Sequence, residues 1–186
     1  KVPISDPITK WPDFPDEQAR FLQVKLPNDC LLLNVYVPNG QSLESDKYKY
    51  KLHWLEALRK HIQTMNLAEQ KLILLGDFNI APSDIDVHDV AAWQDKVLVS
   101  PPEREAYQQL VELGLVDSYR TVYPEQPGFT WWDYRQAAWR RDRGVRIDLI
   151  LVSQALWPQC RYITIDRDIR GLERPSDHVP VCIEVS

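Results

Sequence analysis

Apolar residues gather in runs along the chain that are typical of buried β-strands. The first run, CLLLNVYVP at 30–38, closes with Pro-Asn-Gly, which signals a turn. Three further runs are KLILL at 71–75, VRIDLILVS at 145–153 and HVPVCIEVS at 178–186. FTWWDYR at 129–135 and RYITIDRD at 161–168 predict two shorter strands.

Two segments between the strands carry the spacing of helices. In the first, Ser45 can cap the start, and Leu52, Leu55, Leu58 and Ile62 recur at helical intervals. The second, at 103–114, ends on Gly114, a common helix stop. The opening 21 residues, rich in Pro and Asp, and the stretch 76–102 predict loops. Alternating strands and helices indicate an α/β fold without an internal domain boundary.

Composition narrows the class of protein. The chain has 186 residues, 44% of them hydrophobic, which suits one compact domain. No apolar run is long enough to span a membrane, and the first residues lack the apolar core of a signal peptide. The three cysteines are widely spaced and odd in number, which favours a reducing compartment, the cytoplasm. The net charge is −5, yet the segment around 131–146 is locally basic.

Polar residues interrupt or end four of these strands. They are Tyr36, then Asp77 with Asn79, then Asp148, and finally Asp177 with His178. Side chains two residues apart on a strand share a face, so Asp77 and Asn79 can point at one ligand if the extended path continues. A carboxylate at Asp148, among apolar neighbours, needs a partner. His178 is the natural candidate, because an Asp–His hydrogen bond orients the ring and raises its pKa.

Each of these residues also has a purely structural interpretation. An Asp after Gly at a strand end, as at Asp77, is often a turn residue. Asp148 can be an internal cap or an ion-pair partner of Arg146, the Ser-Asp-His stretch a plain loop, and Tyr36 a core residue. Only the combination of motifs favours a functional site.

Five segments in this order, NVYVPNG, GDFNIAPSDIDVHD, FTWWDYR, RGVRIDLILVS and SDHVPV, resemble the exonuclease III-type apurinic/apyrimidinic endonucleases. These belong to the endonuclease/exonuclease/phosphatase family, and the resemblance runs from about Phe14 to the C-terminus. GDxN and SDH are shared across the family, whereas NVYxPNG with TWWDYR and RIDLIL is more specific to the DNA-repair branch. The resemblance implies a four-layered α/β/β/α sandwich and Mg²⁺- or Mn²⁺-dependent hydrolysis of a phosphodiester.

The resemblance also implies roles for particular residues. Asp77 would activate the attacking water, and Asn79 would hold that water or a phosphate oxygen. His178, held by Asp148, and Tyr36 would contact the scissile phosphate. Asp177 matches a metal ligand. A second possible position for the metal lies near Asp77, Asn79 and His178. Trp131 matches an aromatic wall of the pocket for a flipped abasic sugar, and the basic segment of Arg135, Arg140, Arg141 and Arg143 would bind DNA.

Departures from the family pattern change these expectations. The family's first strands, and the Glu that is its main metal ligand, have no counterpart here, so we expect residues 1–186 to form a single domain of this type, N-terminally truncated with one sheet incomplete. The expected consequences are weakened activity and a homodimer that covers the surface left by the missing segment. Asp142 replaces a usual Asn and would weaken DNA contact, and Val145 replaces a bulkier residue and would loosen the abasic pocket.

Three functions remain open from the sequence. The first is a DNA-repair enzyme that cleaves double-stranded DNA 5′ to abasic sites, with an accompanying 3′-exonuclease or 3′-phosphatase activity. The second is a catalytically impaired DNA-binding remnant of the same fold. The third is a phosphatase acting on a small or lipid substrate, against which the TWWDYR segment argues.

Overall fold

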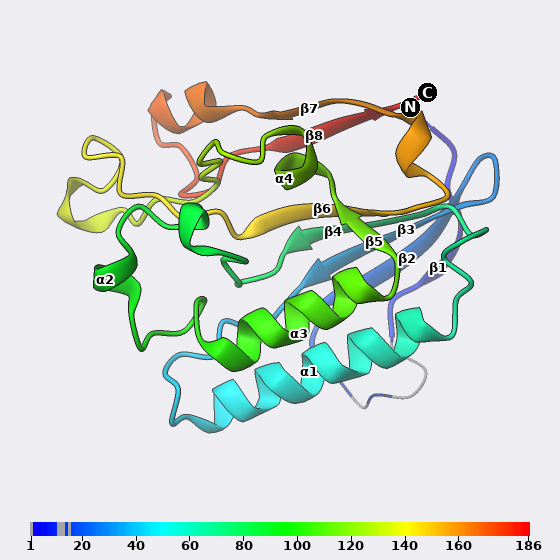
Figure 1. Cartoon of the computed structure of the whole chain (residues 1–186), viewed down its shortest axis with the longest axis horizontal. Helices are drawn as coiled ribbons and strands as arrows, with labels where there is room; N and C mark the ends of the chain where they lie inside the picture. Colours follow the sequence, from blue (N-terminus) through cyan, green and yellow to red (C-terminus); the bar gives the residue numbers. More distant parts are fainter. Residues whose placement is uncertain (1, 11–13, 15) are drawn as a thin grey trace.

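The computed structural model describes residues 2–10, 14 and 16–186. It is an α/β structure in layers (Figure 1). Helices α1 (Asp46–Gln63) and α3 (Pro101–Glu112) cover one face of a six-stranded sheet, and a two-stranded sheet lies over part of the other face. The mixed α/β class is therefore confirmed.

The larger sheet has the order β1-β2-β3-β4-β6-β5. Its strands are β1 (Ser5–Ile8), β2 (Phe21–Leu26), β3 (Cys30–Tyr36), β4 (Leu72–Asp77), β5 (Leu115–Asp117) and β6 (Asp148–Ser153). Only the neighbours β3 and β4 are parallel, and α1 makes the crossover between them. This parallel pair brings the ends of β3 and β4 to the same edge of the sheet.

The smaller sheet pairs β7 (Cys160–Ile165) with β8 (Val181–Val185) in antiparallel fashion. Short helical segments connect the strands: η1 (Asp84–Asp86), α2 (Val90–Trp93), α4 (Ser118–Val122), η2 (Arg135–Ala137), η3 (Trp157–Gln159) and η4 (Arg167–Gly171). Residues 2–10, 14 and 16–186 thus form a helical layer, the large sheet and the small sheet. Among them, no helix is both long and apolar enough to cross a membrane.

The four long apolar runs and both predicted helices are confirmed as elements. Ser45 caps α1 as predicted, since its hydroxyl accepts a hydrogen bond of 3.0 Å from the backbone N–H of Tyr48. Helix α3 starts at Pro101, two residues earlier than predicted, because a capping box at Ser100 and Glu103 begins it. Gly114 follows its end with φ of +106°, the left-handed conformation that suits glycine.

Three predictions from the sequence were wrong. The stretch 76–102 is not all loop, because it holds η1 and α2. The opening segment is not all loop, because it holds β1 and leads into β2 at Phe21; residues 1, 11–13 and 15 of that segment lie outside the described residues. FTWWDYR forms no named strand. Trp131 instead makes isolated bridges to Val145 and His178, so this segment is a connector between the two sheets. Such long-range pairing leaves little trace in local sequence.

Two main cores lie on opposite faces of the large sheet. Fully buried Trp54, Leu58 and Leu74 lie in the core beneath α1 and α3. The second core, around Ile150, Val152 and Ile163, lies under the small sheet, but several of its neighbours are only partly buried: Leu26, Leu32, Leu75, Val181 and Ile183. The helix-covered face is therefore closed, whereas the other face is covered only in part.

Candidate active site

Three predicted site residues form a row across neighbouring strands. In the β3–β4 pair, Tyr36 lies opposite Asp77, and in the β4–β6 pair, Asp77 lies opposite Asp148. Tyr36 and Asp77 are the last residues of β3 and β4, and Asp148 is the first residue of the antiparallel β6. All three therefore lie at the same end of the strands. Strand register alone therefore brings together residues that are far apart in the sequence.

The chain turns sharply around Asp77. Gly76 has φ of +137°, and a Cβ there would lie 1.9 Å from the Val35 carbonyl oxygen, so no larger residue fits this close approach of β3 and β4. Asn79 has φ of +49° and so does not continue the extended path. The backbone N–H of Asn79 donates to Asp77 Oδ1 at 2.8 Å, and its side-chain amide donates to Asp77 Oδ2 at 3.0 Å. A turn, not strand alternation, brings Asp77 and Asn79 together.

The amide of Asn79 is fully engaged. Its Nδ2 also donates to the Val37 carbonyl at 3.0 Å, and its Oδ1 accepts from Asn39 Nδ2 at 2.9 Å. The residue is only 4% exposed. Asn79 therefore orients the Asp77 carboxylate in this structure. Asn39, which the sequence reading had not singled out, completes this arrangement; its position in the Pro-Asn-Gly turn was the available signal.

Asp77 has an unusual environment for a carboxylate. Burial, followed by the nearby charge of Asp148, raises its pKa to about 6, although the bond from the Asn79 backbone and the charges of His178 and Lys51 oppose the change. A carboxylate with such a pKa is a stronger base than an ordinary Asp and is still mostly ionised at neutral pH.

Asp148 and His178 form the hydrogen bond expected from the sequence. His178 Nδ1 lies 2.9 and 3.1 Å from the two oxygens of Asp148, and the side chains are 33% and 20% exposed respectively. Burial by itself would lower the pKa of His178, but the bond to Asp148 and the carboxylate charges outweigh it and raise that pKa. The ring is therefore held by one nitrogen, with the other left to face the site.

Asp177 and Trp131 lie next to this pair. Trp131 Nε1 donates to Asp177 Oδ2 at 2.9 Å, and Trp131 bridges to His178 through the backbone. The predicted metal ligand and the predicted pocket wall are thus bonded to each other. Val145 is fully buried in a cluster with Leu98 and Ile147, with Trp131 packed against it. Val145 and Trp131 thus pack together in one apolar cluster.

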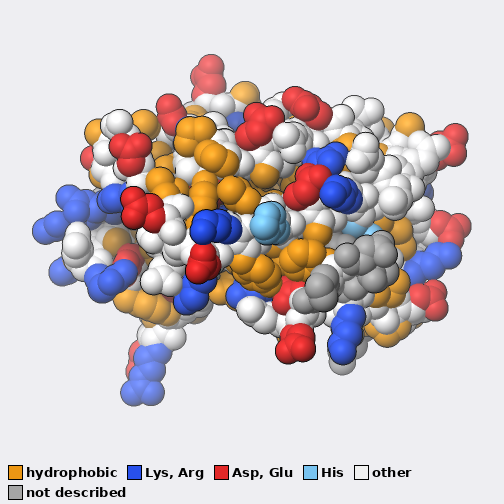
Figure 2. Space-filling model, turned by 90° about the horizontal axis from the view of Figure 1, so that it is seen from below, with side chains coloured by type: hydrophobic (Ala, Val, Ile, Leu, Met, Phe, Trp, Pro, Cys, Tyr) orange, Lys and Arg blue, Asp and Glu red, His pale blue; other side chains and the backbone are white. Residues whose placement is uncertain are grey.

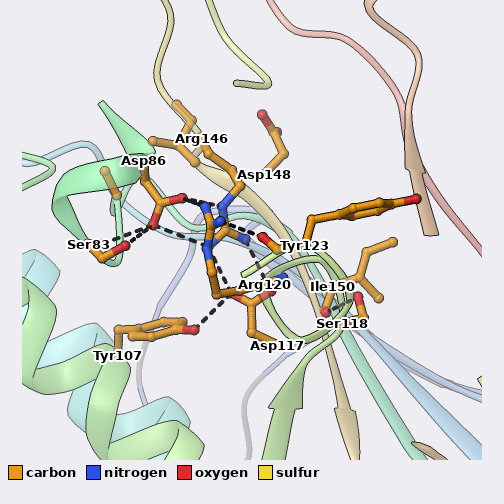
Figure 3. Close-up of polar contacts among 12 residues, drawn as sticks. Ser83, Asp86, Tyr107, Asp117, Ser118, Arg120, Tyr123, Arg146, Asp148 and Ile150 are labelled. Carbon is orange, nitrogen blue, oxygen red and sulfur yellow. Dashed lines mark hydrogen bonds and ion pairs between the residues drawn. The ribbon is translucent and has the colours of Figure 1, made fainter. Parts of the chain in front are cut away.

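A buried ionic network lies at the start of β6, below Asp148 (Figure 3). Arg146, 1% exposed, binds Asp86 through Nε at 2.6 Å and binds both oxygens of Asp117 at 3.1 and 2.9 Å. Arg120 also binds Asp86 at 2.6 Å, and the Tyr107 hydroxyl donates to Asp117 at 2.9 Å. The ion pair considered between Arg146 and Asp148 is not the one formed. Arg146 instead ties the loop after β4 to β5 and β6.

A second buried ionic pair lies behind Asn79. Lys51 of α1 and Glu103 of α3 are both 0% exposed and form an ion pair. The ammonium of Lys51 also donates to the carbonyls of Asn79 at 2.6 Å and Asn39 at 3.2 Å. The pair thus fixes the turn after Asp77 to the helical layer. The sequence reading had missed Lys51, because it lies in a polar stretch of an amphipathic helix.

The predicted DNA-binding arginines lie on an exposed loop beyond Trp131. Figure 2 shows Lys and Arg side chains gathered at one end of the molecule, the end at which Figure 1 draws this loop in yellow. Arg135 pairs with Asp133 at 2.7 Å, whereas Arg140, Arg141 and Arg143 are exposed. A cavity of about 380 Å³ opens here, lined among others by His88, Trp93, Lys96, Trp131, Arg135 and Arg143. Aromatic faces and cations together suit a nucleic-acid strand.

Asp142 does not add an unbalanced negative charge to this loop. Its carboxylate pairs with Arg167 at 2.9 Å and accepts a hydrogen bond of 3.1 Å from Trp132 Nε1. The Arg167 guanidinium in turn lies 5.2 Å from the Trp132 ring centre and 5.4 Å from that of Trp139. The expected weakening of DNA contact by Asp142 therefore loses its electrostatic basis, since a cation from η4 balances the carboxylate.

A divalent cation fits these residues only in part. The facing carboxylates of Asp77 and Asp148 concentrate negative charge, which a cation would relieve. However, side chains already bind the carboxylates of Asp77, Asp148 and Asp177. Across the part of the chain that the structure describes, no group of three or more His, Cys, Asp or Glu is arranged to hold a metal. The described residues offer a partial ligand set of one or two carboxylates, with which a bound Mg²⁺ would keep several of its waters.

Solved structures share this fold. The chain superposes with a TM-score of 0.94 on a 3′ phosphatase from Neisseria, NExo, bound to a product DNA hairpin, with 41% identity over 100% of this chain and 72% of that one. An AP endonuclease from Archaeoglobus fulgidus gives a TM-score of 0.93 at 33% identity, over 99% of this chain and 72% of that one.

Sequence comparison gives the same family. The chain is 36% identical to an exodeoxyribonuclease III from Haemophilus influenzae, over 92% of this chain and 68% of the relative, and 32% identical to the DNA repair nuclease APEX1 of Danio rerio, over 90% and 52%. It thus spans about half to two thirds of these relatives. Residues 1–178 match the endonuclease/exonuclease/phosphatase family, a match that begins before Phe14. The chain therefore belongs to the endonuclease/exonuclease/phosphatase family, and its resemblance within it is to exonuclease III-type AP endonucleases.

Proposed function

We propose that the chain hydrolyses DNA phosphodiester bonds 5′ to abasic sites, with an accompanying activity at 3′ ends. The observation that carries this proposal is the row of Tyr36, Asp77 and Asp148 across three strands, with His178 bonded to Asp148. The 3′ activity, whether exonuclease or phosphatase, is supported by similarity to an exodeoxyribonuclease III and to a 3′ phosphatase.

Asp77 is the proposed general base of this site. Its raised pKa of about 6 favours removal of a proton from a water molecule, which would then attack phosphorus. Both oxygens of Asp77 accept hydrogen bonds from Asn79, so the carboxylate presents a fixed direction to that water. Asn79 is thus proposed to act by orienting Asp77. This role takes the place of the one expected from the sequence, in which Asn79 holds the water or a phosphate oxygen.

His178 and Tyr36 are the proposed phosphate contacts. Because Nδ1 of His178 is bonded to Asp148, Nε2 is the nitrogen left to donate to a nonbridging oxygen. The raised pKa of His178 favours its charged form, which stabilises negative charge in the transition state. Tyr36 is 50% exposed and carries the Arg20 guanidinium 4.8 Å from its ring centre, so its hydroxyl is accessible to DNA.

DNA binding is proposed for Trp131 and the arginine loop. Trp131 would form the wall of the pocket for the abasic sugar, which flips out readily because it carries no base. Arg135, Arg140, Arg141 and Arg143 would contact the phosphate backbone. DNA as the substrate is supported by Trp131, Arg135 and Arg143, which line one cavity, and by the exposure of Arg140 and Arg141 on the same loop.

The proposed cofactor is Mg²⁺ or Mn²⁺, held by Asp77 and Asp177. When bound, such a cation would neutralise charge that develops on the phosphodiester. Since the described ligand set is partial, we expect slow turnover with a requirement for millimolar metal. Mn²⁺ should support more activity than Mg²⁺, because Mg²⁺ demands a more nearly ideal octahedral geometry.

The second candidate function is DNA binding without catalysis. The partial ligand set favours it, since the basic loop and Trp131 do not depend on a metal. The two functions separate in a single assay, because a binding protein retains a salt-dependent complex with abasic DNA but leaves the strand intact.

A homodimer is also proposed. Among the described strands β8 pairs only with β7, and the large-sheet face beside it keeps Leu26 and Leu32 partly exposed. An open strand edge next to an apolar face favours self-association with twofold symmetry. Size-exclusion chromatography with light scattering should give twice the chain mass; a monomer at micromolar concentration would contradict the proposal.

A nicking assay tests the proposed function. A duplex with one tetrahydrofuran abasic analogue is incubated with the chain and Mg²⁺ or Mn²⁺. We expect a cut 5′ to the analogue that Asp77→Asn abolishes while its DNA affinity persists. Cleavage that survives Asp77→Asn would rule out the proposed base, and binding without a cut would favour the second candidate.

A further inference from the structure

The Asp148–His178 pair joins two separate parts of the fold. Asp148 begins β6 of the large sheet, whereas His178 precedes β8 of the small sheet. A hydrogen bond of 2.9 Å between two side chains requires that these backbones keep a fixed separation. The residues that connect the two backbones therefore decide whether the pair forms.

Thr130 makes that connection. Its hydroxyl oxygen accepts hydrogen bonds of 3.1 Å from the backbone N–H groups of both Ile147 and Asp148. Its carbonyl accepts a bond of 2.9 Å from the N–H of Val179, the residue after His178. One residue thus bonds the backbone of Asp148 on one side and the neighbour of His178 on the other.

Thr130 is fully enclosed by the surrounding residues. It is 0% exposed, and its own N–H donates to the Val145 carbonyl at 3.0 Å. No water can replace the hydroxyl while a side chain of this size fills the position. The neighbouring residue Trp131 bridges to His178 and bonds Asp177, so the whole connector depends on where Thr130 lies.

We infer that Thr130 is a positioning residue for the Asp148–His178 pair, acting through its hydroxyl oxygen. This inference rests on the proposed function of that pair. Thr130 touches neither substrate nor the reacting atoms, and its effect comes from fixing the backbone of Asp148 relative to that of His178. A loss of alignment on this scale lowers a rate much more than it lowers binding.

Two variants of similar size separate the hydroxyl from the volume. Thr130→Val keeps the shape and removes the acceptor, whereas Thr130→Ser keeps the acceptor and removes a methyl group. Thr130→Ala serves if the valine variant does not fold, because it removes the same acceptor and places no methyl group against the two N–H donors.

The first readout is spectroscopic and needs no activity. In the intact chain, the hydrogen-bonded Nδ1 proton of His178 should give a downfield NMR resonance, assigned by its loss in His178→Asn. We expect Thr130→Val to lose or move this resonance while amide dispersion shows a folded chain, and Thr130→Ser to keep it. An unchanged resonance in a folded Thr130→Val or Thr130→Ala chain would overturn the inference.

The second readout is nicking of the tetrahydrofuran duplex. We expect Thr130→Val to lower kcat by on the order of tenfold or more with KM within about twofold, and Thr130→Ser to restore kcat. A chain with an altered resonance and unchanged kcat would also overturn a positioning role. Should the parent chain fail to nick DNA, the NMR comparison still decides the inference on Thr130, while the proposed function alone would fall.

Discussion

The two halves of the site are anchored to the rest of the molecule in different ways. The Asp77–Asn79 half rests on the helical layer, through the ion pair of Lys51 and Glu103. The Asp148–His178 half rests on loops and short elements, through Arg146 and its two carboxylates. In both halves a buried charge holds the backbone close behind a side chain of the candidate site.

The two anchors differ in how many buried carboxylates depend on one cation. Glu103 keeps donors other than Lys51, since the backbone N–H groups of Leu98 and Ser100 each bond to it at 3.0 Å. Arg146, by contrast, is the cation of two buried carboxylates. Without it, Asp117 keeps, among the described residues, only the neutral donors of the Tyr107 hydroxyl and the Arg120 backbone N–H, and Asp86 keeps Arg120 as its one cation. The loop-built half should therefore be the more fragile one.

The largest effect is expected for Arg146→Met. It leaves Asp86 and Asp117 buried with much of their charge unbalanced, so we expect the free energy of unfolding to fall by about 3–5 kcal/mol. Urea denaturation followed by circular dichroism measures this. Arg120→Met is the matched control, because Arg120 is 20% exposed and its side chain makes one bond to these carboxylates, beside three to backbone carbonyls; it should cost about 1–2 kcal/mol. Equal losses in the two variants would refute the greater dependence on Arg146.

Lys51→Met should have a smaller effect than Arg146→Met. Glu103 loses its cation but keeps three donors from Leu98 and Ser100, so the expected loss is about 2–3 kcal/mol. The same denaturation experiment measures it. The double variant Lys51→Met/Glu103→Gln should recover part of this loss, because it leaves no unpaired charge. A double variant less stable than Lys51→Met would show that the two residues do not act as a pair.

The pH dependence of stability should differ between the two halves of the site, and Asp77 represents the first half. The folded chain raises the pKa of Asp77 to about 6 from an ordinary 3.8, so ionising Asp77 costs folding free energy. This cost is absent below the unfolded pKa and complete above about pH 6. Asp77→Asn should therefore raise the free energy of unfolding at pH 8, by at most about 3 kcal/mol, and leave it unchanged near pH 3.5. A gain at the lower pH would exclude this explanation.

His178 should show the opposite pH dependence. Because its folded pKa is raised, its stabilisation is fully present below the unfolded pKa and is lost as the pH rises through the folded value. His178→Asn should therefore destabilise the chain at pH 5.5 and change it less at pH 8.5. Denaturation at the two pH values measures this, and an equal change at both would argue against a charged His178 in the folded chain.

The smallest effect concerns the exposed loop, which lies outside both anchors. Arg140→Gln should leave the free energy of unfolding unchanged but reduce the slope of log binding constant against log salt by roughly one, as expected for one lost phosphate contact. Fluorescence anisotropy on abasic duplex measures the slope. Lys60→Gln on α1 removes the same charge away from the loop and should leave the slope unchanged. A matching change in that control would mean that only net charge matters.

The sequence predicted those parts of the fold whose signal is local. Strand β4 is an unbroken apolar run, and α1 has both its cap at Ser45 and its apolar spacing. Strands β1, β2 and β5 were missed. β1 and β5 are so short that their pairing partners are what make them strands. The residues of the site were found through their motifs, and their arrangement follows from strand register, which the sequence shows only through apolar patterns.

The supporting contacts could not be predicted in the same way. Lys51 meets Asn79, and Thr130 meets Asp148, only after distant segments pack together. Asp142 appeared unfavourable for DNA because its partner Arg167 lies on a different element. In each case the chemistry of the residue was visible, but the neighbour that decides its role was not.

The strand register that places Tyr36 opposite Asp77, and Asp77 opposite Asp148, has a consequence for how a preparation of the protein is assessed. If β6 slips by two residues against β4, the same side chains face the same side, and most of the core can still pack. Asp148 would then no longer lie opposite Asp77, so His178 would be carried out of line with the carboxylate proposed to activate water. Such a molecule would pass tests of solubility and secondary structure while being inert. The fraction of active molecules in a preparation therefore measures the fidelity of strand pairing during folding.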